Sequence, residues 1–271
     1  MKTRIISGAV GIALLAVLLL LRTTVVFNIA LALVGALMSY ELLRAEKLEK
    51  EYALLAAGAL YSAACALFAL SKEHGGIIPY IAATFAYIVI CQTVLLVRHK
   101  SIPAGKFFIF EGYSAMSVGC LASLAQMVRL AGSYSLAPII MTCLGAWVAD
   151  SGAYFAGTFF GKHKLCPEIS PKKTVEGLIG GVLANAAVFA VIPLFLDVNL
   201  SVLTFAAFAL LGVCCCLLGL LGDLTASLIK RDAGIKDFGN IMPGHGGAVD
   251  RFDSLIYIAP LMLFITYMGM I

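Results

Sequence analysis

Residues 223–254 read DLTASLIKRDAGIKDFGNIMPGHGGAVDRFDS, and this polar stretch lies between two apolar runs. Only 13% of the chain is charged, yet the stretch holds five Asp, two Lys, two Arg and one His, with three glycines around the histidine. Ionisable residues set against a membrane are costly and usually mark function. Carboxylates suit a hard cation such as Mg²⁺, lysine and arginine suit phosphate oxygens, and glycines let a backbone approach a phosphate closely. The stretch therefore predicts phosphoryl or nucleotidyl transfer.

The rest of the chain is strongly apolar: 62% of its 271 residues are hydrophobic, and the mean hydropathy is +1.01. Runs of about 20 apolar residues recur, which is the length of a transmembrane helix. Because these runs are continuous rather than alternating, they predict helices. We expect an all-α polytopic membrane protein with a single integral membrane domain over 1–271, in which 1–134 holds five helices and 135–271 the catalytic helices and loops. The nine expected spans are 5–21, 25–43, 52–70, 77–97, 107–128, 135–160, 177–197, 201–222 and 254–271.

The distribution of basic residues predicts the orientation of these spans. With the N-terminus in the cytoplasm, 16 of the 19 Lys and Arg fall on the inner side, and only Arg22, Lys72 and Arg129 fall outside. The polar stretch 223–254 and the loop 161–176 then both face the cytoplasm, where nucleoside triphosphates are. The first apolar run lacks a small-x-small cleavage site and further spans follow it, so we interpret it as a retained helix rather than a signal peptide.

The order of polar residues in 223–254 resembles the signature of the phosphatidate cytidylyltransferase (CDP-diacylglycerol synthase) family. Many fixed positions match in sequence, which is more specific than a lone glycine motif. The matching residues are Ser227, Lys230, Arg231, Lys236, Asp237, Pro243, His245, Gly246, Gly247, Asp250, Arg251 and Asp253.

A second polar stretch, 150–177, reads DSGAYFAGTFFGKHKLCPEISPKKTVEG. Its Asp-Ser-Gly-Ala-Tyr run and its Ser-Pro-Lys-Lys-Thr-Val-Glu-Gly loop are similar to motifs of the same family. The hydroxyl groups of Ser170 and Thr174 can donate hydrogen bonds to phosphate oxygens, and Lys173 supplies positive charge. Thr174 is also a candidate cap for the helix that follows, whose N-terminus would favour an anion. The alternative is a basic loop that only obeys the topology rule or touches anionic lipid headgroups.

The resemblance implies that Asp223 and Asp250 are the metal ligands for a Mg²⁺ cofactor, with a second cation as an open alternative.

Asp253 has three possible roles, as a metal ligand, as a partner of Arg251 or as the N-cap of the last span. We favour His245 as an orienting hydrogen-bond group, because the attacking phosphate oxygen is already ionised. The candidate catalytic residues are Asp223, Lys230, Arg231, Lys236, Asp237, His245, Asp250, Arg251 and Asp253. The candidate substrate-binding residues are Asp150, Ser170, Lys173, Thr174, Gly246 and Gly247.

The resemblance further implies CTP:phosphatidate cytidylyltransferase activity for phospholipid biosynthesis, with CTP and phosphatidic acid as substrates, a homodimer, and a place in the cytoplasmic membrane without nucleic-acid partners. Two other readings stay open. One is a CTP-dependent polyprenol or phytol kinase. The other is a transporter, which would need polar residues buried in several spans.

The segment 40–52, YELLRAEKLEKEY, carries charges of both signs at helical spacing. This pattern is typical of a solvated helix face, and we expect that role for it.

Overall fold

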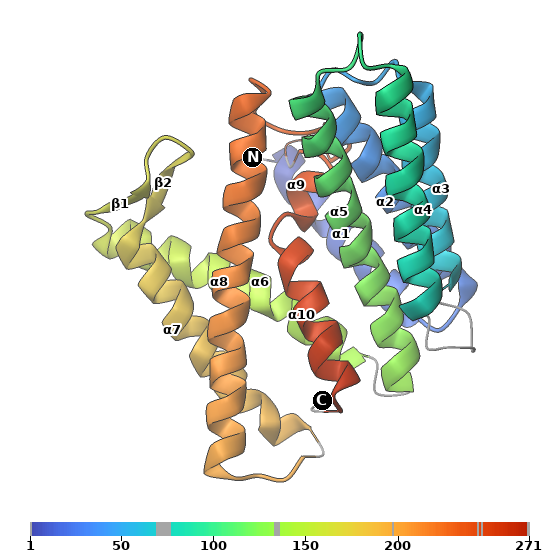
Figure 1. Ribbon diagram of the computed structural model, residues 1–271. Coiled ribbons are helices and arrows are strands. Elements are labelled where there is room, and N and C mark those ends of the chain that lie inside the picture. Colours follow the sequence, from blue (N-terminus) through green and yellow to red (C-terminus); the bar gives the residue numbers. More distant parts are fainter. Residues whose placement is uncertain are drawn as a thin grey trace. The chain divides into compact units, whose positions relative to one another are not determined.

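The computed structural model describes residues 2–68, 77–132, 136–196, 198–242, 244 and 246–269 (Figure 1). Its elements are α1 (Lys2–Leu20), α2 (Val25–Ala45), α3 (Tyr52–Phe68), α4 (Ile77–Val97), α5 (Ala104–Ala131), α6 (Leu136–Phe160), β1 (Lys164–Cys166), β2 (Ser170–Thr174), α7 (Val175–Val191), the 3₁₀ helix η3 (Ile192–Phe195), α8 (Val202–Asp232), α9 (Val249–Phe252) and α10 (Leu255–Tyr267). The chain forms two compact units. Unit 1 is Met1–Ser135 with Ile229–Phe252, and unit 2 is Leu136–Leu228 with Asp253–Ile271.

The helical character expected from the apolar runs is confirmed. By length and composition, six helices in the described parts of the chain are able to cross a membrane: Val25–Ala45, Ile78–Val97, Ala104–Ala131, Leu136–Phe160, Val175–Phe195 and Val202–Asp232. Three further apolar helices are shorter: Gly8–Leu20, Tyr52–Leu67 and Leu255–Tyr267. The chain is thus that of a helical polytopic membrane protein, while the count of nine spans, their orientation and the single domain stay predictions.

One boundary differs from the sequence expectation in a way that matters for the site. The eighth span was expected to end at residue 222, but α8 continues to Asp232. Asp223, Lys230 and Arg231 therefore stand on a helix rather than in a loop. Lys230 and Arg231 lie in the last turn, where cations interact favourably with the carbonyl end of the helix dipole.

In unit 1 the helices α2, α3, α4 and α5 lie side by side (Figure 1). Small and hydroxyl residues let α2 and α3 approach closely, which is typical of helix packing in membranes. The Ser62 hydroxyl donates to the Ala32 carbonyl oxygen at 2.9 Å, and Ser39 and Ser114 share a hydrogen bond of 2.8 Å. The Tyr61 and Tyr87 rings stack at a centroid distance of 4.5 Å, so aromatic packing joins α3 to α4.

In unit 2 the closest pair is α6 with α7, and small residues again explain it. A Cβ on Gly152 of α6 would lie 3.0 Å from the Gly180 carbonyl oxygen and 2.7 Å from the Ala184 methyl group on α7. Asn185 ties a third helix to this pair, because its buried amide donates to the carbonyl oxygens of Gly145 on α6 and Gly212 on α8. These contacts fix the helices that surround the cavity described below.

Residues 161–176 were expected to be a loop between helices, and the structure corrects this. β1 and β2 form an antiparallel hairpin in which Lys164 pairs with Thr174 and Cys166 with Ser170. The hairpin is anchored to α7 by Glu176, whose carboxylate pairs with the His163 ring at 2.6 Å and accepts the Lys162 and His163 backbone amides. The fold is therefore helical with one small hairpin among the described residues.

The expectation of a solvated face over residues 40–52 is wrong for its two buried glutamates. The helix α2 ends at Ala45, and Glu41 and Glu46 are only 4% and 2% exposed, while Arg44 and Lys47 face solvent. The sequence pattern failed here because charge spacing shows which residues share a face and not what packs against that face.

Candidate active site

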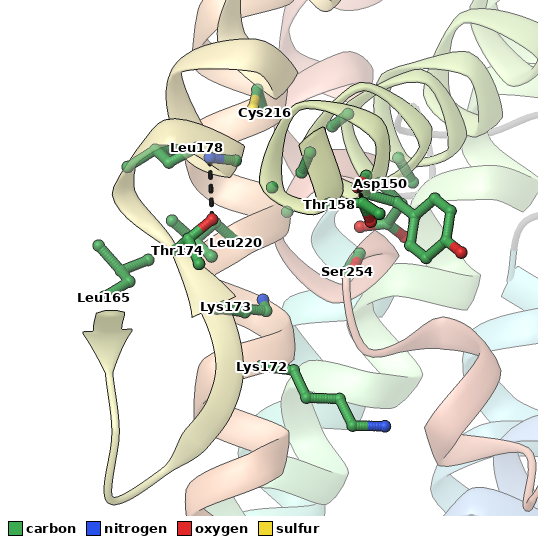
Figure 2. A pocket seen from close by; sticks show the side chains of 17 residues that line it. Asp150, Thr158, Leu165, Lys172, Lys173, Thr174, Leu178, Cys216, Leu220 and Ser254 are labelled. Carbon is green, nitrogen blue, oxygen red and sulfur yellow. Dashed lines mark hydrogen bonds between the residues drawn. The ribbon is translucent and has the colours of Figure 1, made fainter. Parts of the chain in front are cut away.

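Unit 2 contains a cavity of about 350 Å³, within the size range of small-molecule sites (Figure 2). Most of its lining is apolar, from residues of α6, α7 and α8 such as Ala149, Leu178 and Leu220. Its polar residues include Asp150 and Thr158 on α6, Lys172, Lys173 and Thr174 at the end of β2, and Ser254 before α10. An apolar cavity that carries lysines and hydroxyl groups suits an amphipathic anion.

Lys173 and Asp223 form an ion pair in unit 2. The Lys173 ammonium lies 2.5 Å from Asp223 Oδ2, and the Ser227 hydroxyl donates to Asp223 Oδ1 at 3.4 Å. The Asp223 side chain stays 28% exposed, so its carboxylate has room for a further partner. The sequence placed both residues in the site, and the structure brings these two together.

Lys172 is a cavity residue that the sequence analysis did not select. Its side chain runs along the cavity wall in Figure 2, and the described residues give it no ion pair. Lys173, by contrast, is neutralised by Asp223. The sequence shows Lys172 and Lys173 as two adjacent lysines. The conformation of the hairpin decides which of the two has its charge compensated by an acid.

Of the other residues expected to bind substrate in unit 2, Asp150 and Thr174 line the cavity and Ser170 does not. Thr174 is the N-cap of α7: its hydroxyl oxygen accepts the Gly177 amide at 3.1 Å, which confirms the expected capping role. The N-cap of α10 is Ser254 rather than Asp253, so the capping reading of Asp253 is wrong. Asp253 Oδ1 instead accepts the Ser254 amide at 2.7 Å.

In unit 1 the buried Asp250 carboxylate organises the glycine-rich segment. Its side chain is only 4% exposed, and Oδ1 lies 2.8 Å from the Lys230 ammonium. Oδ2 accepts the backbone amides of Phe238 at 2.8 Å and Gly247 at 3.0 Å. Such a buried charge is tolerated only when it is paired and hydrogen-bonded, and Asp250 satisfies both conditions.

Glycine is required next to this carboxylate. Gly246 has φ +88°, and a Cβ there would lie 2.9 Å from Asp250 Oδ2. The Gly246 carbonyl oxygen accepts the Met242 amide at 3.1 Å, which closes a turn. The structure thus brings Lys230, Asp250, Gly246 and Gly247 together, while the expected residue His245 lies outside the described residues.

The remaining candidates of unit 1 are exposed around this centre. Arg231 lies in the last turn of α8, Lys236 and Asp237 lie in the segment after it, and Arg251 stands on α9. Exposed arginine and lysine side chains are able to bind phosphate oxygens as they do in many phosphate sites. Unit 1 therefore presents exposed basic side chains beside the Asp250 carboxylate and the glycines it contacts.

Glu41 is a residue of this region that sequence reasoning missed. From α2 its Oε1 accepts the Ala248 amide and its Oε2 the Val249 amide, both at 2.9 Å. A carboxylate at the start of a helix satisfies amides that have no partner within the helix. Nothing in the sequence links positions more than 200 residues apart, so only the fold reveals this contact.

The two predicted metal ligands differ in how much room they leave for a cation. Asp223 is part-exposed, with one ammonium and one hydroxyl as partners. Asp250 Oδ2 is filled by two amides, and Oδ1 retains one lone-pair position beside Lys230. No group of three His, Cys, Asp or Glu side chains suited to a metal ion occurs in the described ranges. Mg²⁺ commonly takes only one or two carboxylates and completes its shell with water and substrate phosphates, so the part-exposed Asp223 carboxylate by itself is suited to such an ion.

Comparison with known proteins places the chain. It matches the profile of the cytidylyltransferase family over residues 2–268. It is 34% identical to a phosphatidate cytidylyltransferase of Bacillus subtilis (strain 168), with 98% of this chain and 97% of the relative covered. It is 31% identical to one of Staphylococcus haemolyticus (strain JCSC1435), with 97% of each covered, and 35% identical to one of Staphylococcus aureus (strain COL), with 75% of this chain and 76% of that protein covered. The chain belongs to the cytidylyltransferase family.

Proposed function

We propose that this protein is a CTP:phosphatidate cytidylyltransferase, which makes CDP-diacylglycerol and pyrophosphate for phospholipid biosynthesis. The family membership and the name shared by the full-length relatives support nucleotidyl transfer from CTP. The observation that supports a lipid substrate is the cavity of unit 2, because its apolar walls suit the acyl chains of phosphatidic acid and its lysines suit the phosphate. A soluble acceptor would have no need of a membrane fold.

The chemistry requires two anions to meet. An oxygen of the phosphatidate phosphate bonds to the α-phosphorus of CTP, the bond from that phosphorus to its bridging oxygen breaks, and pyrophosphate leaves with the electron pair. No side chain has to donate or accept a proton in this reaction, because the attacking phosphate oxygen is already ionised. The task of the side chains is to hold the reactants in line and to offset charge.

Each unit contributes groups suited to that task. In unit 2, Lys172 and the end of β2 would bind the lipid phosphate. In unit 1, the exposed Arg231, Lys236 and Arg251 around the glycine-rich turn would bind the nucleotide phosphates, and the Lys230–Asp250 pair would hold that turn in shape. This division is based on the surroundings of each group: the cavity of unit 2 is mainly apolar, whereas the basic side chains of unit 1 are exposed to solvent.

We further propose Mg²⁺ as the cofactor, with Asp223 and Asp250 as its candidate carboxylate ligands and a second cation as an open alternative. When bound, Mg²⁺ would neutralise charge on the phosphate oxygens. Lys173 lies beside the Asp223 carboxylate and would supply further positive charge next to that ligand.

The first test follows the label of CTP in purified protein supplied with phosphatidic acid and Mg²⁺. We expect ³²P from the α position to enter a chloroform-soluble product, and transfer to stop when EDTA removes the divalent cation. Label from the γ position should remain in the aqueous phase. Transfer of γ label to an added lipid alcohol, with no transfer of α label, would instead identify a lipid kinase. If folded protein transfers neither the α label nor the γ label, the transporter hypothesis remains.

A second test addresses the lipid site. Replacing Lys172 with Gln removes a cation from the cavity wall, so the KM for phosphatidic acid should rise by about tenfold or more, as expected when a hydrogen bond to a charged group is lost. The KM for CTP should stay unchanged.

The matched control is Lys164→Gln, which removes an exposed lysine of the same hairpin that does not line the cavity. Wild-type kinetics in this control, beside a changed KM for phosphatidic acid in Lys172→Gln, support the assignment. A rise in the KM for CTP alone would assign the cavity to the nucleotide.

We also propose that the N-terminus and both polar stretches face the cytoplasm in the cytoplasmic membrane, with nine spans, because basic residues concentrate on that side. The homodimer implied by the resemblance stays a prediction that a single chain does not test.

The orientation is testable with Cys166, a part-exposed cysteine of the hairpin. A membrane-impermeant maleimide should label it in inside-out vesicles and not in sealed right-side-out vesicles, and Cys166→Ser should remove that label. Labelling only from the outer side would reverse the proposed topology.

A further inference from the structure

Glu41 links two distant parts of unit 1. It stands near the end of α2 and is 4% exposed, and both oxygens of its carboxylate accept backbone amides at the start of α9. The amide of the residue before these, Gly247, goes to Asp250 Oδ2. Three successive amides, of Gly247, Ala248 and Val249, are thus held by two carboxylates.

The glycines of this segment pack directly on the Glu41 side chain. A Cβ on Gly247 would lie 2.5 Å from both Glu41 oxygens, and one on Gly239 would also collide with Oε1. Real Cβ atoms do not approach oxygen so closely, so the backbone fits around the carboxylate only because both positions are glycine. Glu41 therefore packs against the backbone at Gly239 and again at Gly247, and it holds the two amides that follow Gly247.

We propose that Glu41 is a positioning residue for the nucleotide site. It holds the glycine-rich turn and the start of α9, and through them it sets the placement of Asp250 and Arg251. It touches no reacting atom, so its effect passes through the backbone. The kinetic part of this inference rests on the proposed cytidylyltransferase activity, whereas the backbone part does not.

Glu41→Gln is the sharpest change at this position. The side chain keeps its size, but one acceptor oxygen becomes an NH₂ group. Because the Ala248 and Val249 amides are both donors, an NH₂ group facing either of them leaves that amide without an acceptor. The turn should loosen while the helices around it stay packed.

Glu46→Gln is the matched control, because Glu46 is also a buried glutamate at the end of α2. Its Oε1 has no hydrogen-bond partner, and among the described residues no hydrogen bond or ion pair joins the Glu46 side chain to residues 239–249. Burial raises the pKa of the Glu46 carboxyl, and the Lys106 ammonium opposes this. Glutamine keeps the size of the side chain at this position.

The experiment combines hydrogen exchange of the full-length protein in lipid nanodiscs with steady-state kinetics. In Glu41→Gln, we expect faster amide exchange in peptides that cover 239–252 and unchanged exchange in α2 to α5. The kcat/KM for CTP should fall by about tenfold or more, with the KM for phosphatidic acid unchanged. Glu46→Gln should match the wild type in both measurements.

Wild-type exchange over 239–252 in Glu41→Gln would overturn the proposal, and so would faster exchange spread over all of unit 1 with unchanged KM values. If Glu41→Gln does not fold, Glu41→Asp provides the test. Aspartate keeps both acceptor oxygens but withdraws them by one methylene, so we again expect faster exchange over 239–252 and a lower kcat/KM for CTP. Wild-type exchange and kinetics in Glu41→Asp would overturn the proposal. A wild-type protein that transfers no label from CTP would reject the proposed activity, while the exchange data would still decide the role of Glu41.

Discussion

The pairing of Asp250 with Lys230 is the constraint on which unit 1 of this protein depends. A carboxylate that is 4% exposed requires compensation, and it receives an ammonium on one oxygen and two backbone amides on the other. Those amides belong to Phe238 and Gly247, so the compensation also shapes the segment between them. The charge that looks like a catalytic signature is, at the same time, the structural centre of the turn.

In unit 2 the Asp223 carboxylate is likewise compensated by the Lys173 ammonium, although that pair is more exposed. In unit 1 the acid and its lysine come from the same polar stretch, whereas in unit 2 Lys173 of the stretch 150–177 neutralises Asp223 of the stretch 223–254. Net positive charge for phosphate binding must therefore come from other residues, which are Lys172 at the cavity and Arg231, Lys236 and Arg251 around the turn. The paired lysines therefore hold the site in shape, and the exposed cations are the candidates for binding a substrate anion.

Hydropathy predicted the helices, because the length and composition of an apolar run depend on local sequence. The cap formed by Thr174 could be predicted for the same reason. Three features could not be predicted from local sequence: the hairpin of β1 and β2, the continuation of α8 through Asp223, and the burial of Glu41. Glu41 meets its partners through a contact that spans most of the chain, and its neighbours in sequence are charged, so local patterns placed it in solvent.

A double-mutant cycle on Lys230 and Asp250 tests the central claim most directly. It compares Lys230→Met, Asp250→Asn and the double variant by kcat/KM for transfer of α-labelled CTP into lipid. If the two side chains act as one unit, the double variant should lose no more than the worse single variant, because each single change already breaks the pair and leaves a buried group uncompensated. Losses that multiply in the double variant would show two independent roles and would contradict this account.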